Sequence, residues 1–124
     1  RRFRNVIYDS LLERTRAVQL SARESEGLIW KPKPKFTLGC PENTYTADFR
    51  VWTPGDPFLR CMVGQKAVQL HVPEGWVEEV KGPVRTGIGR LKKLWESYGP
   101  VPLVILTSRD GTGSTWRWEV VIPK

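Results

Sequence analysis

The feature of the sequence that most constrains the fold is an almost uninterrupted apolar run, VPLVILT, at residues 101–107. A run of this length is typical of a strand that is buried on both faces of a sheet. It follows a helical pattern at residues 84–98, whose regular part is expected from Ile88, and a strand pattern at 76–81 comes before that. A strand, a crossover helix and a second strand predict a parallel pair in the middle of a sheet.

Length and charge limit the class of protein. The 124 residues, 40% of them hydrophobic, are enough for one domain over residues 1–124 but not for two. A net charge of +7 favours a polyanionic partner, and a basic protein without such a partner is the alternative.

From this sequence we expect neither a membrane segment nor a secretory leader. No apolar run approaches the roughly 18 residues of a membrane span, and the Arg-rich start lacks the apolar segment of a signal peptide. We therefore expect a cytoplasmic protein with no membrane partner. The chain begins at Arg1 without a methionine, which leaves open a longer native N-terminus. Cys40 and Cys61, with His71 alone to help, form no zinc pattern and are expected to be free thiols.

Further elements complete the predicted order. An amphipathic helix is predicted at residues 4–25, with Gly27 as its stop signal. Strands are predicted at 36–38, 44–52 and 115–122, and a hairpin with arms at 58–63 and 66–72. The order predicts an α/β fold with a central mixed β-sheet flanked by helices.

The strand at residues 76–81 combines acids with a lysine. Because side chains alternate along a strand, Glu79 and Lys81 share one face and Glu78 lies on the other, where it should be dispensable. A carboxylate and an ammonium on one face can meet a metal ion and a phosphate together. Such a triplet also arises by chance, so it is informative only if other acids lie close to it.

Two other acids are candidates to join that strand. Asp48 falls in the predicted strand at 44–52, where Asp is depleted, so it is a metal ligand, a strand-end cap or half of an ion pair with Arg50. Glu13 shares one face of the first predicted helix with Asp9 and is either a functional acid or a solvent-facing charge.

A basic segment follows the first predicted helix. Its two prolines favour an extended backbone over residues 28–35. Lys31, Lys33 and Lys35 alternate along it, and the segment either tracks a phosphate chain or is a solvated linker.

The order of these pieces resembles the PD-(D/E)xK nuclease superfamily, and within it the phage-encoded endonucleases that resolve Holliday junctions. The matching segments are residues 9–13, 33–36, 45–49 and 77–82, and the resemblance covers roughly residues 3–107. It implies a restriction-endonuclease-like core in the order α-β-β-β-α-β. Ala47 stands where the superfamily motif has its proline. A hairpin inserted at about residues 57–72 lengthens the interval before Glu79; it is a dimerisation element, a junction contact or a surface embellishment.

The resemblance implies a Mg²⁺-dependent structure-specific endodeoxyribonuclease that resolves four-way junctions in DNA recombination and repair, with Mn²⁺ expected to substitute. Glu13, Asp48, Glu79 and Lys81 would be the catalytic residues. Asp48, Glu79 and the backbone carbonyl of Val80 would bind the metal, and Glu13 would reach a second metal or its water. Lys81 would orient or help deprotonate the attacking water and stabilise the transition state.

The resemblance also implies a homodimer acting on branched double-stranded DNA in the cytoplasm of a phage-infected host. The expected DNA-binding residues are Arg2, Arg4, Lys31, Lys33, Lys35, Arg85, Arg90, Lys92 and Lys93. Two alternatives remain. One is another nuclease of the same superfamily, of restriction, transposase or repair type. The other is a non-catalytic basic module that binds nucleic acid, in which the acids form ordinary ion pairs.

Overall fold

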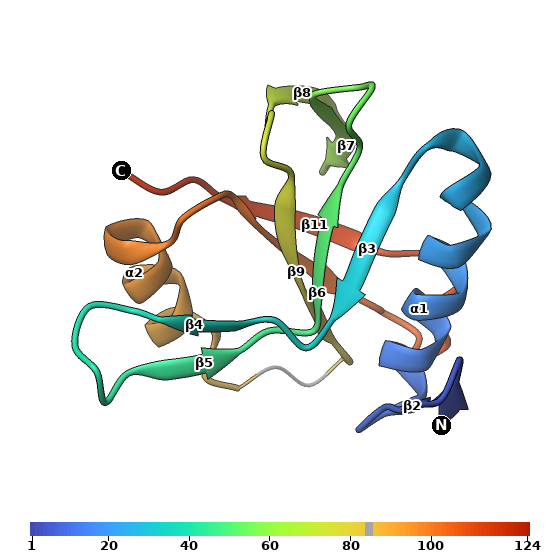
Figure 1. Cartoon of the computed structure of the whole chain (residues 1–124), viewed down its shortest axis with the longest axis horizontal. Coiled ribbons are helices and arrows are strands. Elements are labelled where there is room, and N and C mark those ends of the chain that lie inside the picture. Colours follow the sequence, from blue (N-terminus) through green and yellow to red (C-terminus); the bar gives the residue numbers. More distant parts are fainter. Residues whose placement is uncertain (84–85) are drawn as a thin grey trace.

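The computed structural model describes residues 1–83 and 86–124, and its largest sheet has five strands (Figure 1). In spatial order they are β11 (Arg117–Val121), β10 (Leu103–Thr107), β9 (Trp76–Lys81), β6 (Phe49–Trp52) and β3 (Ile29–Pro32). β9 and β10 run parallel and the other neighbours are antiparallel. All five residues of β10 are buried, so the predicted parallel pair with a buried strand is confirmed.

The remaining strands pair in three small sheets. These are β1 (Arg2–Phe3) with β2 (Val6–Ile7), β4 (Lys35–Thr37) with β5 (Thr44–Thr46), and β7 (Phe58–Val63) with β8 (Lys66–His71). The predicted hairpin at residues 58–72 is confirmed as β7–β8, which lies at the top of Figure 1 and packs on the core through Leu59 and Leu70.

The described residues contain two α-helices and a single 3₁₀ turn. These are α1 (Leu11–Ala22), the 3₁₀ turn η1 (Glu24–Glu26) and α2 (Ile88–Tyr98). The regular part of the second helix begins at Ile88 as predicted. Val84 and Arg85, in the first part of that predicted helix, lie outside the described residues.

The predicted fold class is wrong. The structure is mostly β, with 38% strand and 21% helix, and it has several small sheets in place of a two-layer α/β core flanked by helices. Two physical reasons account for the difference. Strand pairs such as β4–β5 and β7–β8 hydrogen-bond to each other and do not extend the central sheet. The first predicted helix is also much shorter than its apolar periodicity suggested.

That helix, predicted from residue 4, begins only at Leu11. Arg4 and Asn5 have positive φ angles of 50° and 65°, which turn the chain and allow β1 to pair with β2. The hydroxyl of Ser10 then accepts a hydrogen bond from the Glu13 N–H at 3.1 Å and caps the new helix. Asp9 therefore precedes the helix and does not share a helical face with Glu13.

The strand predicted at residues 44–52 is interrupted. Lys33, with a φ of 57°, turns the chain between β3 and β4, so the facing chain bends as well, between β5 and β6. Across the bend, Lys33 N–H donates to Asp48 O and Ala47 N–H donates to Pro34 O, both at 2.9 Å. Asp48 therefore lies at a break between two strands and not inside one.

Two buried clusters stabilise the arrangement. One contains Ala17 and Leu20 of α1 together with Val80 and Leu106 of the sheet. The other contains Leu91 and Trp95 of α2 together with alternate sheet residues such as Val77 and Ile105. The alternation of β9 thus directs Glu78 toward the α1 cluster and Glu79 toward the α2 cluster.

Candidate metal centre and adjoining cleft

Asp48 is held at the edge of β9 by two backbone contacts. Its carboxylate oxygen Oδ2 accepts a hydrogen bond from the Val80 N–H at 2.6 Å, and its own N–H donates to Glu78 O at 3.2 Å. The side chain therefore lies just before the start of β6, beside the part of β9 that β6 does not pair with. Arg50 does not pair with it and instead donates to the carbonyls of Val51 and Trp76 at 3.2 and 3.3 Å.

Three carboxyl groups meet at this point. The side chains of Glu13, from α1, and Glu79, from β9, both lie within hydrogen-bonding reach of Asp48. The pKa of Asp48 is raised far above its ordinary value, first by burial and then by those two neighbours. Two carboxyl groups share a hydrogen bond only if one keeps a proton, so their crowding favours the neutral form of Asp48. A cation placed between them would remove that penalty.

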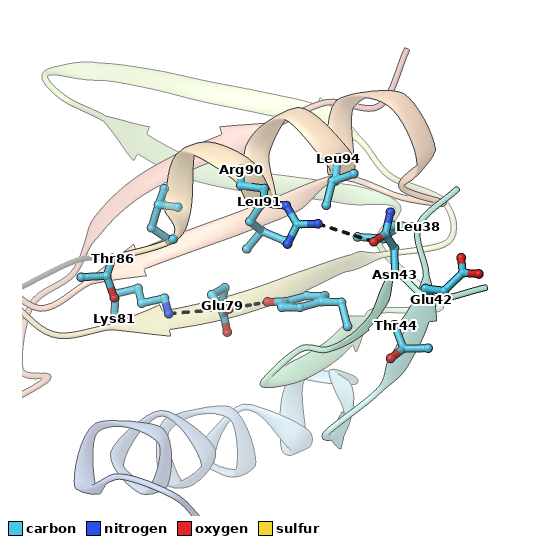
Figure 2. Close-up of a pocket in the computed structure, with 13 residues that line it drawn as sticks. Leu38, Glu42, Asn43, Thr44, Glu79, Lys81, Thr86, Arg90, Leu91 and Leu94 are labelled. Carbon is cyan, nitrogen blue, oxygen red and sulfur yellow. Dashed lines mark hydrogen bonds and ion pairs between the residues drawn. The ribbon is translucent and has the colours of Figure 1, made fainter. Parts of the chain in front are cut away.

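Glu79 has two partners on its own face of the sheet. The hydroxyl of Tyr45, on β5, donates to Glu79 Oε2, and the ammonium of Lys81 lies 3.9 Å from the same oxygen (Figure 2). Burial and the charge of Glu79 raise the pKa of Tyr45, so the phenol stays a neutral donor. The sequence did not indicate Tyr45. The available signal was its position two residues before Ala47 in an alternating segment.

Glu78 has a different environment from its neighbour. It lies on the opposite face, as predicted, and is fully buried there. It receives two hydrogen bonds from Arg16, at 2.7 and 2.8 Å, and one from Trp76 Nε1 at 3.0 Å. Both charges are removed from water, so losing either leaves the other unpaired. The expectation that Glu78 is dispensable therefore does not hold for the fold.

The backbone of Val80 also faces the acids. Its N–H is directed at Asp48, and the carbonyl of a strand residue points to the same edge as its N–H. Because β6 begins only at Phe49, the pairing with β9 does not extend to Ala47 and Val80. The predicted ligand carbonyl is therefore oriented toward Asp48.

The donor set fits a hard cation that takes few protein ligands. Among the described residues, no group of three or more His, Cys, Asp and Glu side chains is placed to hold a metal ion by itself. Mg²⁺ retains several waters and needs only one or two carboxylates with substrate phosphate, which Asp48 and Glu79 can supply. The buried hydroxyl of Tyr8, whose pKa is raised by burial and then by Glu13, has no hydrogen-bond partner within the described part of the chain.

A cleft of about 450 Å³ opens beside these groups. Figure 2 shows Glu79 and Lys81 on β9 at its base, α2 with Arg90, Leu91 and Leu94 along one wall, and residues of the β4–β5 region along the other. Arg90 reaches across the opening to Asn43 at 3.5 Å.

The predicted DNA-binding residues divide into two groups. Arg2, Lys31, Lys35, Arg90 and Lys93 are exposed. Three others make structural contacts: Arg4 with Glu24 at 2.8 Å, Lys33 with the Ile7 carbonyl at 2.8 Å, and Lys92 with Glu119 at 2.6 Å. Arg85 lies outside the described residues. Arg4 and Lys33 are exposed as well, so what the contacts change is the freedom of these side chains and not their place on the surface.

Comparisons with known proteins add no relative. No family model matches the chain, and no curated protein or solved structure matches it significantly. Neither helix of the described residues has both the length and the apolar character needed to cross a membrane.

Proposed function

We propose that this protein is a Mg²⁺-dependent DNA endonuclease that hydrolyses phosphodiester bonds in branched DNA, with the four-way junction as its substrate and a homodimer as its active form. The observation that supports the hydrolytic part is the meeting of Glu13, Asp48 and Glu79 beside Lys81. The junction, the dimer and the place of the protein among the PD-(D/E)xK nucleases rest on the sequence resemblance.

Each of these side chains has a chemical role in that reaction. Bound Mg²⁺ would supply charge stabilisation and an activated water for attack on phosphorus. Asp48, Glu79 and the Val80 carbonyl would hold the ion, and Glu13 would orient water from the α1 side. Lys81, about one-third exposed, would orient the attacking water and stabilise charge on the phosphate oxygens. Tyr45 would fix the carboxylate of Glu79 by its hydrogen bond.

The exposed cations favour a nucleic-acid substrate. Phosphate contacts from Lys31, Lys35, Arg90 and Lys93 would position the strand and carry no sequence information. A symmetric junction has two opposed strands to cut, which calls for a two-fold dimer.

One cleavage experiment tests the proposal. A four-way junction, a linear duplex, a single strand and a flap are incubated with the protein in Mg²⁺ or in EDTA. We expect Mg²⁺-dependent cutting, strongest on the junction, that is lost in Asp48→Asn. Asp56→Asn is the matched control, because Asp56 pairs with Arg60 at 2.6 Å away from the site.

Three results would redirect the proposal. Binding without cleavage under any metal would leave only the non-catalytic binding module. Cutting of every substrate equally would favour another type of nuclease. Cutting that survives Asp48→Asn would refute the assigned centre.

A further inference from the structure

We propose that the cleft beside Glu79 binds one unpaired nucleotide of the substrate strand, with the base between α2 and the β4–β5 region and the phosphate near Lys81. The inference rests on the proposed function and names the feature of the DNA that this site would recognise: a nucleotide that has left the base stack next to the bond to be cut.

The size of the cleft is suited to a small ligand. Its volume of about 450 Å³ lies within the roughly 300–1,000 Å³ of sites that enclose small molecules. A base within a duplex is stacked between its neighbours and reaches such a pocket only after leaving the stack, which costs least where it is already unpaired. Branch points, flaps and gaps supply such bases.

The walls of the cleft suit the faces of a flat heterocycle. Leu91 and Leu94 line it from α2, and Leu38 lines it from the segment that follows β4. Leu38 and Leu91 are buried, and Leu94 is half-buried. The part of each side chain that lines the cavity is apolar. Apolar walls with a few convergent polar groups are the usual composition of such sites.

The opening of the cleft carries groups that can bind the edge of a base. Asn43 has an amide that both donates and accepts, and Arg90 donates only. Their contact, 3.5 Å between Arg90 Nη2 and Asn43 Oδ1, is long, so little is lost when either turns to a ligand. Arg90 is also exposed and can stack on a base.

The base of the cleft joins it to the candidate metal centre. Glu79 and Lys81 line the cavity, and the hydroxyl of Tyr45, another lining residue, donates to Glu79. A phosphate attached to a base in the cleft would therefore lie beside the ammonium of Lys81 and the carboxylate that would hold the ion (Figure 2). The same cleft would thereby select an unpaired nucleotide and place its phosphate for attack.

The test measures binding without cleavage. The wild-type protein in Mg²⁺ is titrated with deoxynucleoside 5′-monophosphates, with deoxyribose 5-phosphate and with inorganic phosphate, while methyl NMR signals of Leu38, Leu91 and Leu94 are followed. We expect saturable shifts of these methyls with the nucleotides and not with the two probes that lack a base. Equal shifts with inorganic phosphate would overturn the inference.

Three variants sharpen the result. Leu94→Trp fills the cavity and should weaken nucleotide binding about tenfold or more, whereas Met62→Trp adds the same bulk on the exposed β7–β8 hairpin and should change nothing. Asn43→Ala removes only the amide and should weaken binding about threefold to tenfold. This variant still tests the inference if Leu94→Trp fails to fold. Binding that is unchanged in both Leu94→Trp and Asn43→Ala would overturn the inference.

The two proposals fail separately. If the protein binds nucleotides in the cleft but cuts no DNA, the proposed nuclease function is refuted and the proposed nucleotide site stands. If cleavage requires Asp48 but no nucleotide binds in the cleft, the nucleotide site is refuted and the nuclease function stands.

Discussion

Glu78 and Glu79 are adjacent on β9, yet their surroundings are opposite. Glu78 is enclosed on the α1 side, where Arg16 matches its charge through two short hydrogen bonds and Trp76 donates a third. Glu79 faces the α2 side, where it meets another acid, Asp48, and an ammonium no closer than 3.9 Å. One carboxylate has its full set of partners inside the protein. The other lies in an acid cluster that an added cation would stabilise, and this difference separates a structural acid from a candidate ligand.

The largest expected effect is on stability and tests the ion pair between Glu78 and Arg16. Arg16→Ala leaves a buried carboxylate unpaired and should lower the free energy of unfolding by about 3–5 kcal/mol, measured by urea denaturation. Arg60→Ala breaks the exposed pair with Asp56 and should cost at most about 1 kcal/mol. Equal losses in the two variants would mean that the buried Arg16–Glu78 ion pair contributes no more to stability than an exposed pair.

The next effect is on the cleavage rate and tests the role of Lys81, the cation next to Glu79. Lys81→Ala removes the cation next to Glu79 and should reduce kcat for Mg²⁺-dependent cleavage about 10²–10³-fold, with a stability close to that of the wild type. Single-turnover cleavage of a labelled junction measures it. Lys66→Ala, at an exposed position on the β7–β8 hairpin, is the control and should leave kcat unchanged. An unchanged rate in Lys81→Ala would remove this lysine from the reaction.

A third effect concerns pH. Because the folded pKa of Asp48 is raised, the folded protein keeps a proton that the unfolded chain loses above about pH 4. The unfolded state then binds fewer protons, so metal-free stability should fall as pH rises into the neutral range. Asp48→Asn cannot ionise and should be more stable than the wild type at pH 8 by about 1–3 kcal/mol.

Thermal unfolding in EDTA from pH 5 to pH 8 measures this difference. The curves of Asp48→Asn and wild type should diverge with increasing pH, and Mg²⁺ should recover part of the loss in the wild type alone. Parallel curves in EDTA would show that Asp48 ionises normally within the folded protein.

The smallest effect concerns Tyr45. Tyr45→Phe removes the hydrogen bond to Glu79 and should cost about 0.5–1.5 kcal/mol of stability. Tyr98→Phe, at an exposed position on α2, should be neutral by the same denaturation measurement. A neutral Tyr45→Phe would mean that Glu79 does not depend on the phenol for its orientation.

Local alternation predicted β9 and its faces correctly, because a period of two is set by strand geometry alone. The break at Ala47–Asp48 could not be predicted in the same way, since it depends on a turn at Lys33 in the facing chain. The first helix is predicted to start too early, because apolar spacing carries no information on the positive φ angles of Arg4 and Asn5. Long-range pairing of strands then decided the fold class.

The candidate site was predicted in part. Asp48 and Glu13 were proposed from their sequence positions, and the structure brings both within reach of each other. The pairing of Arg16 can be inferred from its position: it adjoins Ala17 and precedes Leu20 by four, so it belongs to the buried face of α1. A cation on a buried face requires an acid on the element against it. The sequence predicts Lys92 as a DNA contact from its charge, and it does not reveal the pairing with Glu119, which comes from a distant strand.

The clamp between Arg16 and Glu78 has a consequence for mutational screens. Arg16 and Glu13 are one turn apart on α1, so the ion pair that fastens this helix to β9 also sets how far Glu13 reaches toward Asp48. An inactive variant at Arg16 would therefore report a displaced scaffold. Loss of activity there is no sign that the guanidinium touches DNA.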